Sequence, residues 1–234
     1  MVTGMNRKTA HVILGCVLAL LAAASIAIAR GYTISPQEIV RRKTEALARG
    51  GLHEAAKITG TFIGHTRLKP TNTPASIEEL VGGAQAVVVG VATSNAGHIT
   101  PNGRNIYSEF RFTVSDVLKG YVGATTVEVL IPGGRVEFDD GRWAQVNVPG
   151  FTRPLANRRY LLLLKRAPGN VIKDQNRLQR TAFVPIAGGL GVFELGQQVK
   201  PSGGLDVELG RTLARGRHSE ESFLRLIRQR IGAQ

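Results

Sequence analysis

The sequence predicts a mainly β protein: a small antiparallel barrel or sandwich, with a helix on its N-terminal side and another on its C-terminal side. Between Ala86 and Leu195, short apolar segments recur at close spacing and are separated by turns rich in Gly, Pro, Asn and Asp. Several segments alternate apolar and polar residues, as half-buried strands do, and others are apolar on both faces. Helical segments do not alternate with these strands, which disfavours a parallel sheet.

Residues 1–29 have the layout of a secretory signal. The basic pair Arg7-Lys8 precedes an apolar run, Val12–Ala29, which ends in the small-x-small tripeptide Ala27-Ile28-Ala29. Two interpretations stay open: a peptidase cuts after this tripeptide, or the segment remains as an N-terminal membrane anchor whose positive end lies inside. A third, lipidation at Cys16, is disfavoured because most of the apolar run follows that cysteine.

Each interpretation places the rest of the chain outside the cytosol. The protein is then periplasmic or secreted if the signal is cleaved, and otherwise anchored in the inner membrane through residues 12–29. Nucleic acid is not an expected partner outside the cytosol. Cys16 is the only cysteine, so the exported part has no internal disulfide and must be stabilised by its core.

The chain is strongly basic, with 30 Lys and Arg residues against 17 Asp and Glu and a formal net charge of +13. This excess predicts an anionic partner: an acidic face of an envelope protein, an acidic polymer or an anionic lipid. The alternative is a solvated basic surface with no specific partner.

Residues 30–72 predict a capped helix followed by a linker. Ser35-Pro36-Gln37-Glu38 is a capping box with proline at the first helical position. A helix is therefore expected over 36–48, ending at Gly50-Gly51. Its few apolar residues indicate a surface helix or a spacer between membrane and domain, and a short strand is expected near 57–63.

The β domain is expected over residues 73–200. A short helix capped by Thr73 begins near Pro74 and ends at Gly82-Gly83. The predicted strands are 86–92, 106–115, 127–131, 136–138, 143–148, 160–164, 183–186 and 192–195. Asp139–Arg142 has the sequence of a hairpin turn, and Gly188-Gly189 is expected to form the last hairpin.

The C-terminal part is predicted to be a Gly- and Arg-rich linker, 201–217, followed by an amphipathic helix within 218–234. Ser219 caps that helix, acidic residues occupy its first turn and arginines follow, which complements the helix dipole. The apolar stripe between Phe223 and Ile231 is expected to dock on its own domain. The alternatives are a partner protein and an anionic bilayer surface.

Four motifs occur in an order that resembles a family of uncharacterised exported bacterial proteins. They are a helix with a valine-rich strand (Ile77–Gly90), a V-L-K-G corner (Val117–Gly120), a V-x-V-x-x-P-G-G strand (Val127–Gly134) and R-Y-L-L-L-L (Arg159–Leu164). The order is also similar to the OB-type barrel of netrin-like and metalloproteinase-inhibitor-like domains. The resemblance implies an OB-like barrel of five or six strands, typically a binding module. It does not imply protease inhibition, because such inhibitors use an N-terminal cysteine and Arg30 offers no such group.

No residue pattern points to catalysis, a metal ion or a cofactor. The histidines beyond the signal lack the spacing of zinc ligands; they are His53, His65, His98 and His218. Asp139-Asp140 is better explained as a turn than as a cation site, because calcium needs a longer series of oxygen ligands. A Gly-x-Ser-x-Gly elbow is absent, and Gly188–Gly191 lacks the lysine of a phosphate loop.

One ligand face is predicted, at a mouth of the barrel, where basic and aromatic residues would form a groove for an anionic or sugar-like ligand. Its candidate residues are Trp143, Phe151, Arg153, Arg158, Arg159 and Tyr160. The expected function is that of a non-enzymatic, exported binding or interaction module of the cell envelope. Two alternatives stay open: an exported hydrolase with a site assembled from distant residues, and an envelope assembly component that contacts anionic lipid.

Overall fold

The structure is a computed structural model of the 234-residue chain. It describes residues 34–66, 74–120, 122–123, 125–149, 151–168, 171, 182–203 and 208–233. The signal or anchor predicted at residues 1–29, with Cys16, and the predicted cap Thr73 lie outside the described residues. The chain divides into two compact units, Met1–Arg41 and Arg42–Gln234.

The described chain begins and ends with helices and has most of its strands between them. The helices are α2 (Pro36–Lys57), α3 (Ile77–Gly82), α5 (Glu208–Arg215) and α6 (Glu220–Gly232), with a 3-10 helix η1 (Ile186–Gly189). The strands are β1 (Thr61–His65), β2 (Ala86–Ile99), β3 (Ile106–Lys119), β4 (Thr126–Pro132), β5 (Gly134–Glu137), β6 (Trp143–Asn147), β7 (Arg159–Arg166), β8 (Phe183–Pro185), β9 (Val192–Glu194) and β10 (Lys200–Pro201). None of the described helices is both long enough and apolar enough to cross a membrane.

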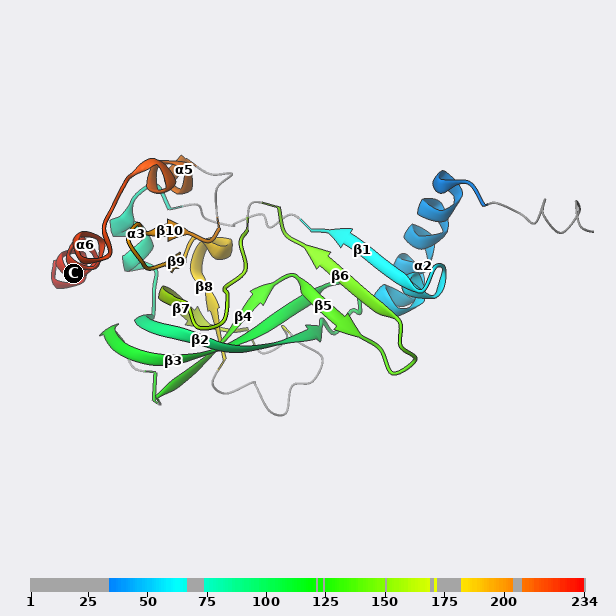
Figure 1. The fold of residues 1–234 in the computed structure, drawn as a ribbon, viewed down its shortest axis with the longest axis horizontal. Coiled ribbons are helices and arrows are strands. Elements are labelled where there is room, and N and C mark those ends of the chain that lie inside the picture. Colours follow the sequence, from blue (N-terminus) through cyan, green and yellow to red (C-terminus); the bar gives the residue numbers. More distant parts are fainter. Residues whose placement is uncertain are drawn as a thin grey trace, which may run out of the picture. The chain divides into compact units, whose positions relative to one another are not determined.

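Five strands close into a ring (Figure 1). β2 pairs with β3, β3 with β4, β4 with β8, β8 with β7, and β7 pairs back with β2. In chain order the strands of the ring are β2, β3, β4, β7 and β8. The third of them, β4, lies beside the fifth, β8. This arrangement is an OB-like Greek-key barrel, and the predicted mainly β fold with flanking helices is confirmed.

One contact in the ring differs from the antiparallel prediction. β4 and β8 run parallel, paired at Val129 and Phe183. The physical reason is geometric: strands in a ring of five cannot alternate direction at every contact, so at least one neighbouring pair must be parallel.

The two segments that the sequence marks as apolar on both faces, 86–92 of β2 and 160–164 of β7, are buried on both sides. Val88 and Leu162 lie in the core inside the barrel, together with Phe110, Phe112 and Val129. The next residues along each strand face the other way and join a second core outside the ring; these are Val87, Val89, Leu161 and Leu163. Continuous apolar runs are therefore required here, because neither face meets water.

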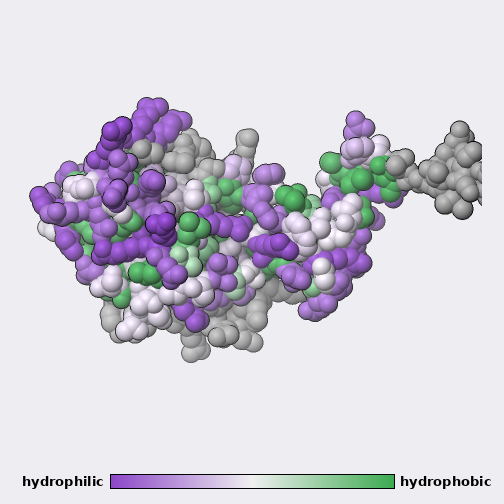
Figure 2. Space-filling model, in the orientation of Figure 1, coloured by the Kyte–Doolittle hydropathy of each residue, from purple (hydrophilic) through white to green (hydrophobic). Residues whose placement is uncertain are grey.

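Helices cover this outer face of β2 and β7. The α6 residues Phe223, Leu224 and Ile227 are buried there, with the Phe223 ring 5.0 Å from that of Phe193 on β9. The α6 stripe thus docks on its own domain, as expected. Leu213 of α5 joins the same core, whereas the surface over α5 is strongly hydrophilic in the view of Figure 2.

A second sheet, in the order β1-β6-β5, packs against the far end of the β2–β3 ribbon. β5 and β6 form the predicted hairpin around Asp139–Arg142. A Cβ atom at Gly97 of β2 would overlap the carbonyl oxygen of Arg135 on β5, so the two backbones touch there. A small separate core fills this junction and includes Leu52, Ile106 and Val136.

Helix α2 begins as predicted and does not end as predicted. The Ser35 hydroxyl accepts a hydrogen bond from the Glu38 amide at 3.2 Å. At Gly51 the backbone leaves the helical region (φ 80°, ψ −164°), but a second helical segment follows up to Lys57. Its residues Leu52, Ala55 and Ala56 are buried, so packing sustains a helix where the glycine pair predicted an end.

Three other segments also differ from prediction. Ser76 caps α3 by accepting a hydrogen bond from the Glu79 amide, so the helix starts later than Pro74. β8 and β9 do not form a hairpin; each pairs with β7, and η1 joins them along its edge. The predicted linker 201–217 contains α5, whose Leu213 is buried. The glycine-rich composition concealed this short anchored helix.

Candidate functional site

A cavity of about 530 Å³ opens on the outer side of the barrel, at the loop end of β3 and β4. We call it the barrel-face cavity. It is lined by Thr66, Thr100, Pro101, Asn102, Asn105, Ile106, Tyr107, Pro132, Pro168 and Val171. These residues come from four parts of the chain: the end of β1, the β2–β3 loop with the start of β3, the end of β4, and the segment after β7.

The position of the cavity can be compared with the place where barrels of this fold bind ligands. OB barrels bind oligomeric ligands on the face of their second and third strands, between the loop joining strands one and two and the loop joining strands four and five. Here those elements are β3, β4, the β2–β3 loop and the β7–β8 connection. Tyr107 and Pro132 supply the strand face, while Asn102 and Pro168 represent the two loops.

The β2–β3 loop is fixed by its own hydrogen bonds. The buried Thr100 hydroxyl donates to Oδ1 of Asn102 at 2.7 Å and accepts from the backbone N–H of Asn105 at 3.0 Å. Gly103, with φ 71°, turns the chain, and its carbonyl oxygen accepts from the Leu52 amide at 2.8 Å. The loop therefore reaches the cavity already ordered, which lowers the entropy lost on binding.

Tyr107 contributes both apolar and polar surface to the lining. Its ring packs beside Leu130 and Val184, outside the barrel. Burial raises the pKa of the phenol, so the hydroxyl stays protonated and can both donate and accept a hydrogen bond. Thr66 and Asn105 also line the cavity, and the side chains of these three residues make no hydrogen bond to the described residues.

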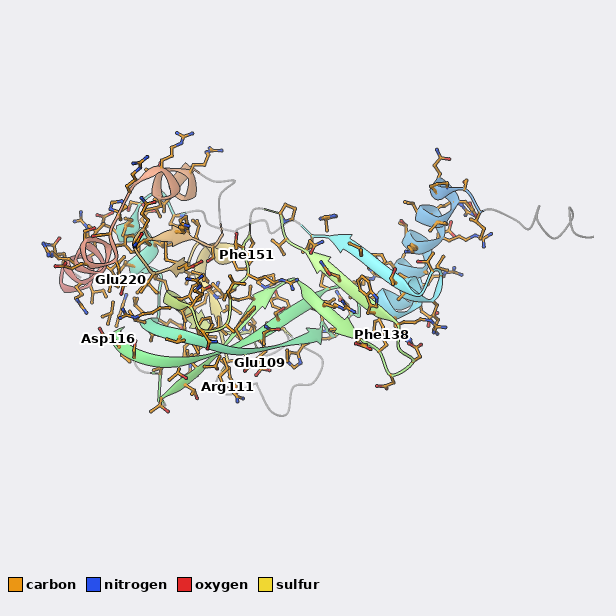
Figure 3. All side chains as sticks on the ribbon, in the orientation of Figure 1. Glu109, Arg111, Asp116, Phe138, Phe151 and Glu220 are labelled. Carbon is orange, nitrogen blue, oxygen red and sulfur yellow. The ribbon has the colours of Figure 1, made fainter. Side chains whose placement is uncertain are left out.

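Charged residues continue along the same face of β3. Glu109 shares a hydrogen bond with Nε2 of His98 at 2.8 Å, and Arg111 donates to Glu128 of β4 at 3.3 Å. Figure 3 shows Glu109 and Arg111 along this strand. Glu109 and Arg111 thus each contact a side chain on a neighbouring strand.

The residues of the predicted ligand face are not assembled into one surface. Tyr160 is 1% exposed: its ring packs edge-on to Phe112 inside the barrel, and its hydroxyl accepts from the Leu155 amide at 2.8 Å. Burial raises the pKa of this phenol as well. Tyr160 is therefore a core residue and cannot contribute to a groove.

Trp143 lies on a different sheet from Tyr160. It belongs to β6, and the guanidinium of Arg135 on β5 lies 4.3 Å from the ring centroid. This is a cation–π contact on the face of the sheet that points away from its small core. Tryptophan here pairs with an arginine of its own hairpin rather than with the predicted basic cluster.

Three of the four remaining predicted residues, Phe151, Arg153 and Arg159, each contact a different part of the protein. Phe151, labelled in Figure 3, lies over Gly189 and Gly203, where a Cβ atom on either glycine would strike its ring. Arg153 donates to the Val146 carbonyl at 3.4 Å, and burial lowers the pKa of its guanidinium. Arg159 is paired with Glu220 of α6, whereas Arg158 is exposed.

Candidate metal ligands are dispersed in the described part of the chain, where no group of three His, Cys, Asp or Glu side chains could hold an ion. Asp140 instead stabilises its turn: Oδ1 accepts from the Arg142 amide at 3.1 Å, and Oδ2 lies 2.8 Å from Nε2 of His53. The geometry thus supports the interpretation of Asp139-Asp140 as part of a hairpin turn.

The sequence contains one signal for the cavity. The alternation along β3 assigns Tyr107, Glu109 and Arg111 to the face directed toward solvent, which is the face on which the cavity opens. Pro168 and Val171, in the segment after β7, could not be assigned to the cavity from the sequence, because only the folded ring brings them beside β3. Scanning the sequence against protein-family models gives no match, and neither does a search of curated proteins.

Proposed function

We propose that this chain is an exported binding module of the cell envelope whose ligand binds in the barrel-face cavity. The observation that carries the proposal is the position of the cavity, which lies between the β2–β3 loop and two residues that follow β7, Pro168 and Val171. Loops at these two places in the chain frame ligand sites on OB barrels. The ordered β2–β3 loop and the polar side chains of Thr66, Asn105 and Tyr107 support it. The location outside the cytosol belongs to the proposal and rests on the composition of residues 1–29.

The binding part is tested with the full chain, tagged at its C-terminus and captured from detergent-solubilised bacterial envelope at 0.1 M and 1 M salt. Three proteins are compared: wild type, the double variant Tyr107→Phe with Asn105→Ala, and Asn95→Ala, an exposed amide on β2 outside the cavity. We expect an envelope component that wild type and Asn95→Ala retain at 1 M salt and that the double variant loses. Recovery that vanishes at 1 M salt for all three would mean generic charge attraction, because screening shortens the Debye length to about 3 Å.

The location is tested separately. Protease is added to spheroplasts that express the same tagged chain, with a cytosolic protein as the control. Export predicts that the tag is degraded while the cytosolic control stays intact. A tag protected until the membrane is lysed would contradict the proposal.

A further inference from the structure

We propose that the outer edge of β1 binds an extended acidic segment of a partner protein, which adds a fourth strand to the three-stranded sheet β1-β6-β5. The inference goes beyond the proposed function, because it concerns an edge of the second sheet and does not depend on the barrel-face cavity. Of the two edge strands of this sheet, β5 touches β2 at Gly97, and β1 forms the other edge (Figure 1). Extended peptides commonly bind proteins by pairing with such an edge.

Hydrogen bonds at the two ends of β1 fix which of its backbone groups face β6. The Trp143 N–H donates to the Gly60 carbonyl at 3.4 Å, and the Thr66 N–H donates to the Asn147 carbonyl at 2.9 Å. Since the bonds of a parallel pair are evenly spaced, every second residue from 60 to 66 bonds to β6. The residues between them direct their N–H and C=O groups away from β6; these are Thr61, Ile63 and His65.

A side chain of α2 already binds on this outer side of β1. The Lys43 ammonium donates to the Thr61 carbonyl at 2.8 Å, as expected for a carbonyl that points away from β6. Leu47 of α2 and Phe62 of β1 pack against the same small core, so Lys43 reaches the edge from the Phe62 face of the strand. Burial lowers the pKa of this ammonium, and a carboxylate beside it would stabilise its charged form.

The centre of the edge is open to solvent. Ile63 is 57% exposed, and His65 is exposed as well. Ile63 lies on the face opposite Phe62, beside Gln145 of β6. A strand added here would cover the Ile63 side chain and pair with its backbone, so apolar burial and hydrogen bonding both favour binding.

The position of Lys43 predicts acidic residues in the added strand. Side chains of that strand alternate between the two faces, so those on one face would contact Ile63 and those on the other would lie toward Lys43. The matching sequence therefore alternates apolar β-branched residues with aspartate or glutamate. The formal net charge of +13 attracts such a segment and disfavours a second copy of this chain, which carries the same charge.

The experiment is amide hydrogen exchange, measured by NMR on the full chain in detergent with and without a synthetic peptide. The acidic probe is acetyl-Val-Asp-Val-Asp-Val-Asp-Val amide, which has the same sequence in both directions and so tests either strand orientation. The contrasting probe has lysine in place of each aspartate, and each peptide is used at about 5 mM.

Four proteins are compared: wild type, Ile63→Pro, Lys43→Glu and the control Lys165→Glu. Lys165 is exposed on β7, so the control makes the same change of net charge on the other sheet. Proline is tolerated where the N–H of an edge strand faces away from the sheet, so Ile63→Pro should keep the fold. Circular dichroism confirms that each variant is folded.

In the free protein, exchange should be faster at Ile63 and His65, whose amides point away from β6, than at Gly64, whose amide bonds to β6. The acidic peptide should slow exchange at Ile63 at least about fivefold in wild type and in Lys165→Glu, and the lysine peptide should have a smaller effect. Lys43→Glu should reverse this order of the two peptides. In Ile63→Pro the acidic peptide should no longer slow exchange at His65.

Each of the following results would overturn the inference. Ile63 and His65 exchange in the free protein as slowly as Gly64, which would mean that the edge is already covered; the acidic peptide leaves exchange at both residues unchanged; the two peptides act equally on wild type; or Lys43→Glu still prefers the acidic peptide. Protection of His65 in a folded Ile63→Pro, equal to that in wild type, would also contradict pairing at this edge. If Ile63→Pro does not fold, the charge preference of Lys43→Glu still decides the question.

Discussion

Asp140 lies in the turn between β5 and β6, where two basic side chains meet its carboxylate. Nε2 of His53 lies 2.8 Å from Oδ2, and Nη1 of Arg142 lies 2.5 Å from the same oxygen. The hydrogen bond with His53 is the main cause that lowers the pKa of Asp140 from 3.8 to about 2, and Arg142 acts in the same direction. The His53 ring also lies 4.5 Å from the Phe138 ring, so this contact joins the second segment of α2 to the hairpin.

Replacing Asp140 by Asn should therefore destabilise the protein in a pH-dependent way. A carboxyl whose pKa is lowered by folding contributes its full stability above its unfolded pKa of 3.8, and this contribution is lost as the pH falls through the folded pKa of about 2. We expect wild type to have a larger free energy of unfolding than Asp140→Asn at pH 7, and a much smaller difference between the two proteins at pH 2. Urea unfolding at both pH values measures this difference.

The neighbouring Asp139→Asn serves as the control, because Asp139 lies in the same turn and is not part of the contact with His53. Equal unfolding free energies for the two variants at pH 7 would contradict the assignment. High salt should reduce the effect of Asp140→Asn, since the contact is accessible to solvent.

At the scale of elements, α6 is attached by an apolar stripe and by a border of ion pairs. Ile227 is fully buried against the outer core, while Arg228 pairs with Asp116 of β3 at 3.0 Å and Arg230 with Glu78 of α3 at 2.5 Å. Figure 3 shows Asp116 and Glu220 on the side of the barrel that α6 covers. The arginines that suggested an anionic bilayer surface are thus directed in part to carboxylates of the protein itself.

The two kinds of contact should contribute very unequally to stability. Ile227→Ala leaves a cavity in a close-packed core and should lower the free energy of unfolding by about 2–4 kcal/mol. Arg228→Ala breaks a pair whose side chains are 57% and 43% exposed, so the loss should stay below about 0.5 kcal/mol. Chemical denaturation compares the two; a loss above about 1.5 kcal/mol for Arg228→Ala would mean that ion pairs hold the helix.

The sequence predicts those elements that depend on residues close together in the chain. The doubly apolar runs of β2 and β7 require cover on two faces, and both faces are covered. The cap at Ser219 and the hairpin at Asp139–Arg142 depend on residues a few positions apart. Pairings set by distant contacts were not predictable: the strand expected at 183–186 is present as β8, but its partners β4 and β7 are defined only by closure of the ring.

The residues of the site also divide into those that local pattern could predict and those that depend on distant contacts. Tyr107 could be assigned to the outer face of its strand from alternation alone, but aromatic and basic composition pointed to Trp143 and Tyr160 instead. Composition identifies residue types that are common in binding sites and carries no information on which face of a closed barrel they occupy. The cavity depends on Thr66 and Pro168, which only the folded chain brings to the same place.

At the scale of the whole molecule, the β2–β3 ribbon joins two cores. Each strand is 14 residues long; Phe110 and Phe112 lie in the barrel interior, whereas Ile106 lies in the small core beneath β5 and β6. The backbones of β2 and β5 touch at Gly97, so the second sheet cannot separate without exposing the end of the ribbon. This continuity predicts that the barrel and the second sheet unfold together.

The single tryptophan allows a direct test of that prediction. Trp143 lies in β6, so its fluorescence reports the second sheet, while far-ultraviolet circular dichroism reports the whole protein. The two signals should give coincident denaturation curves, because one cooperative transition exposes both cores. Val136→Ala, which removes two methyl groups from the small core, should shift both curves equally, with a loss of about 1–3 kcal/mol. A Trp143 transition at lower denaturant, moved alone by Val136→Ala, would show that the second sheet is an independent unit attached to a stable barrel.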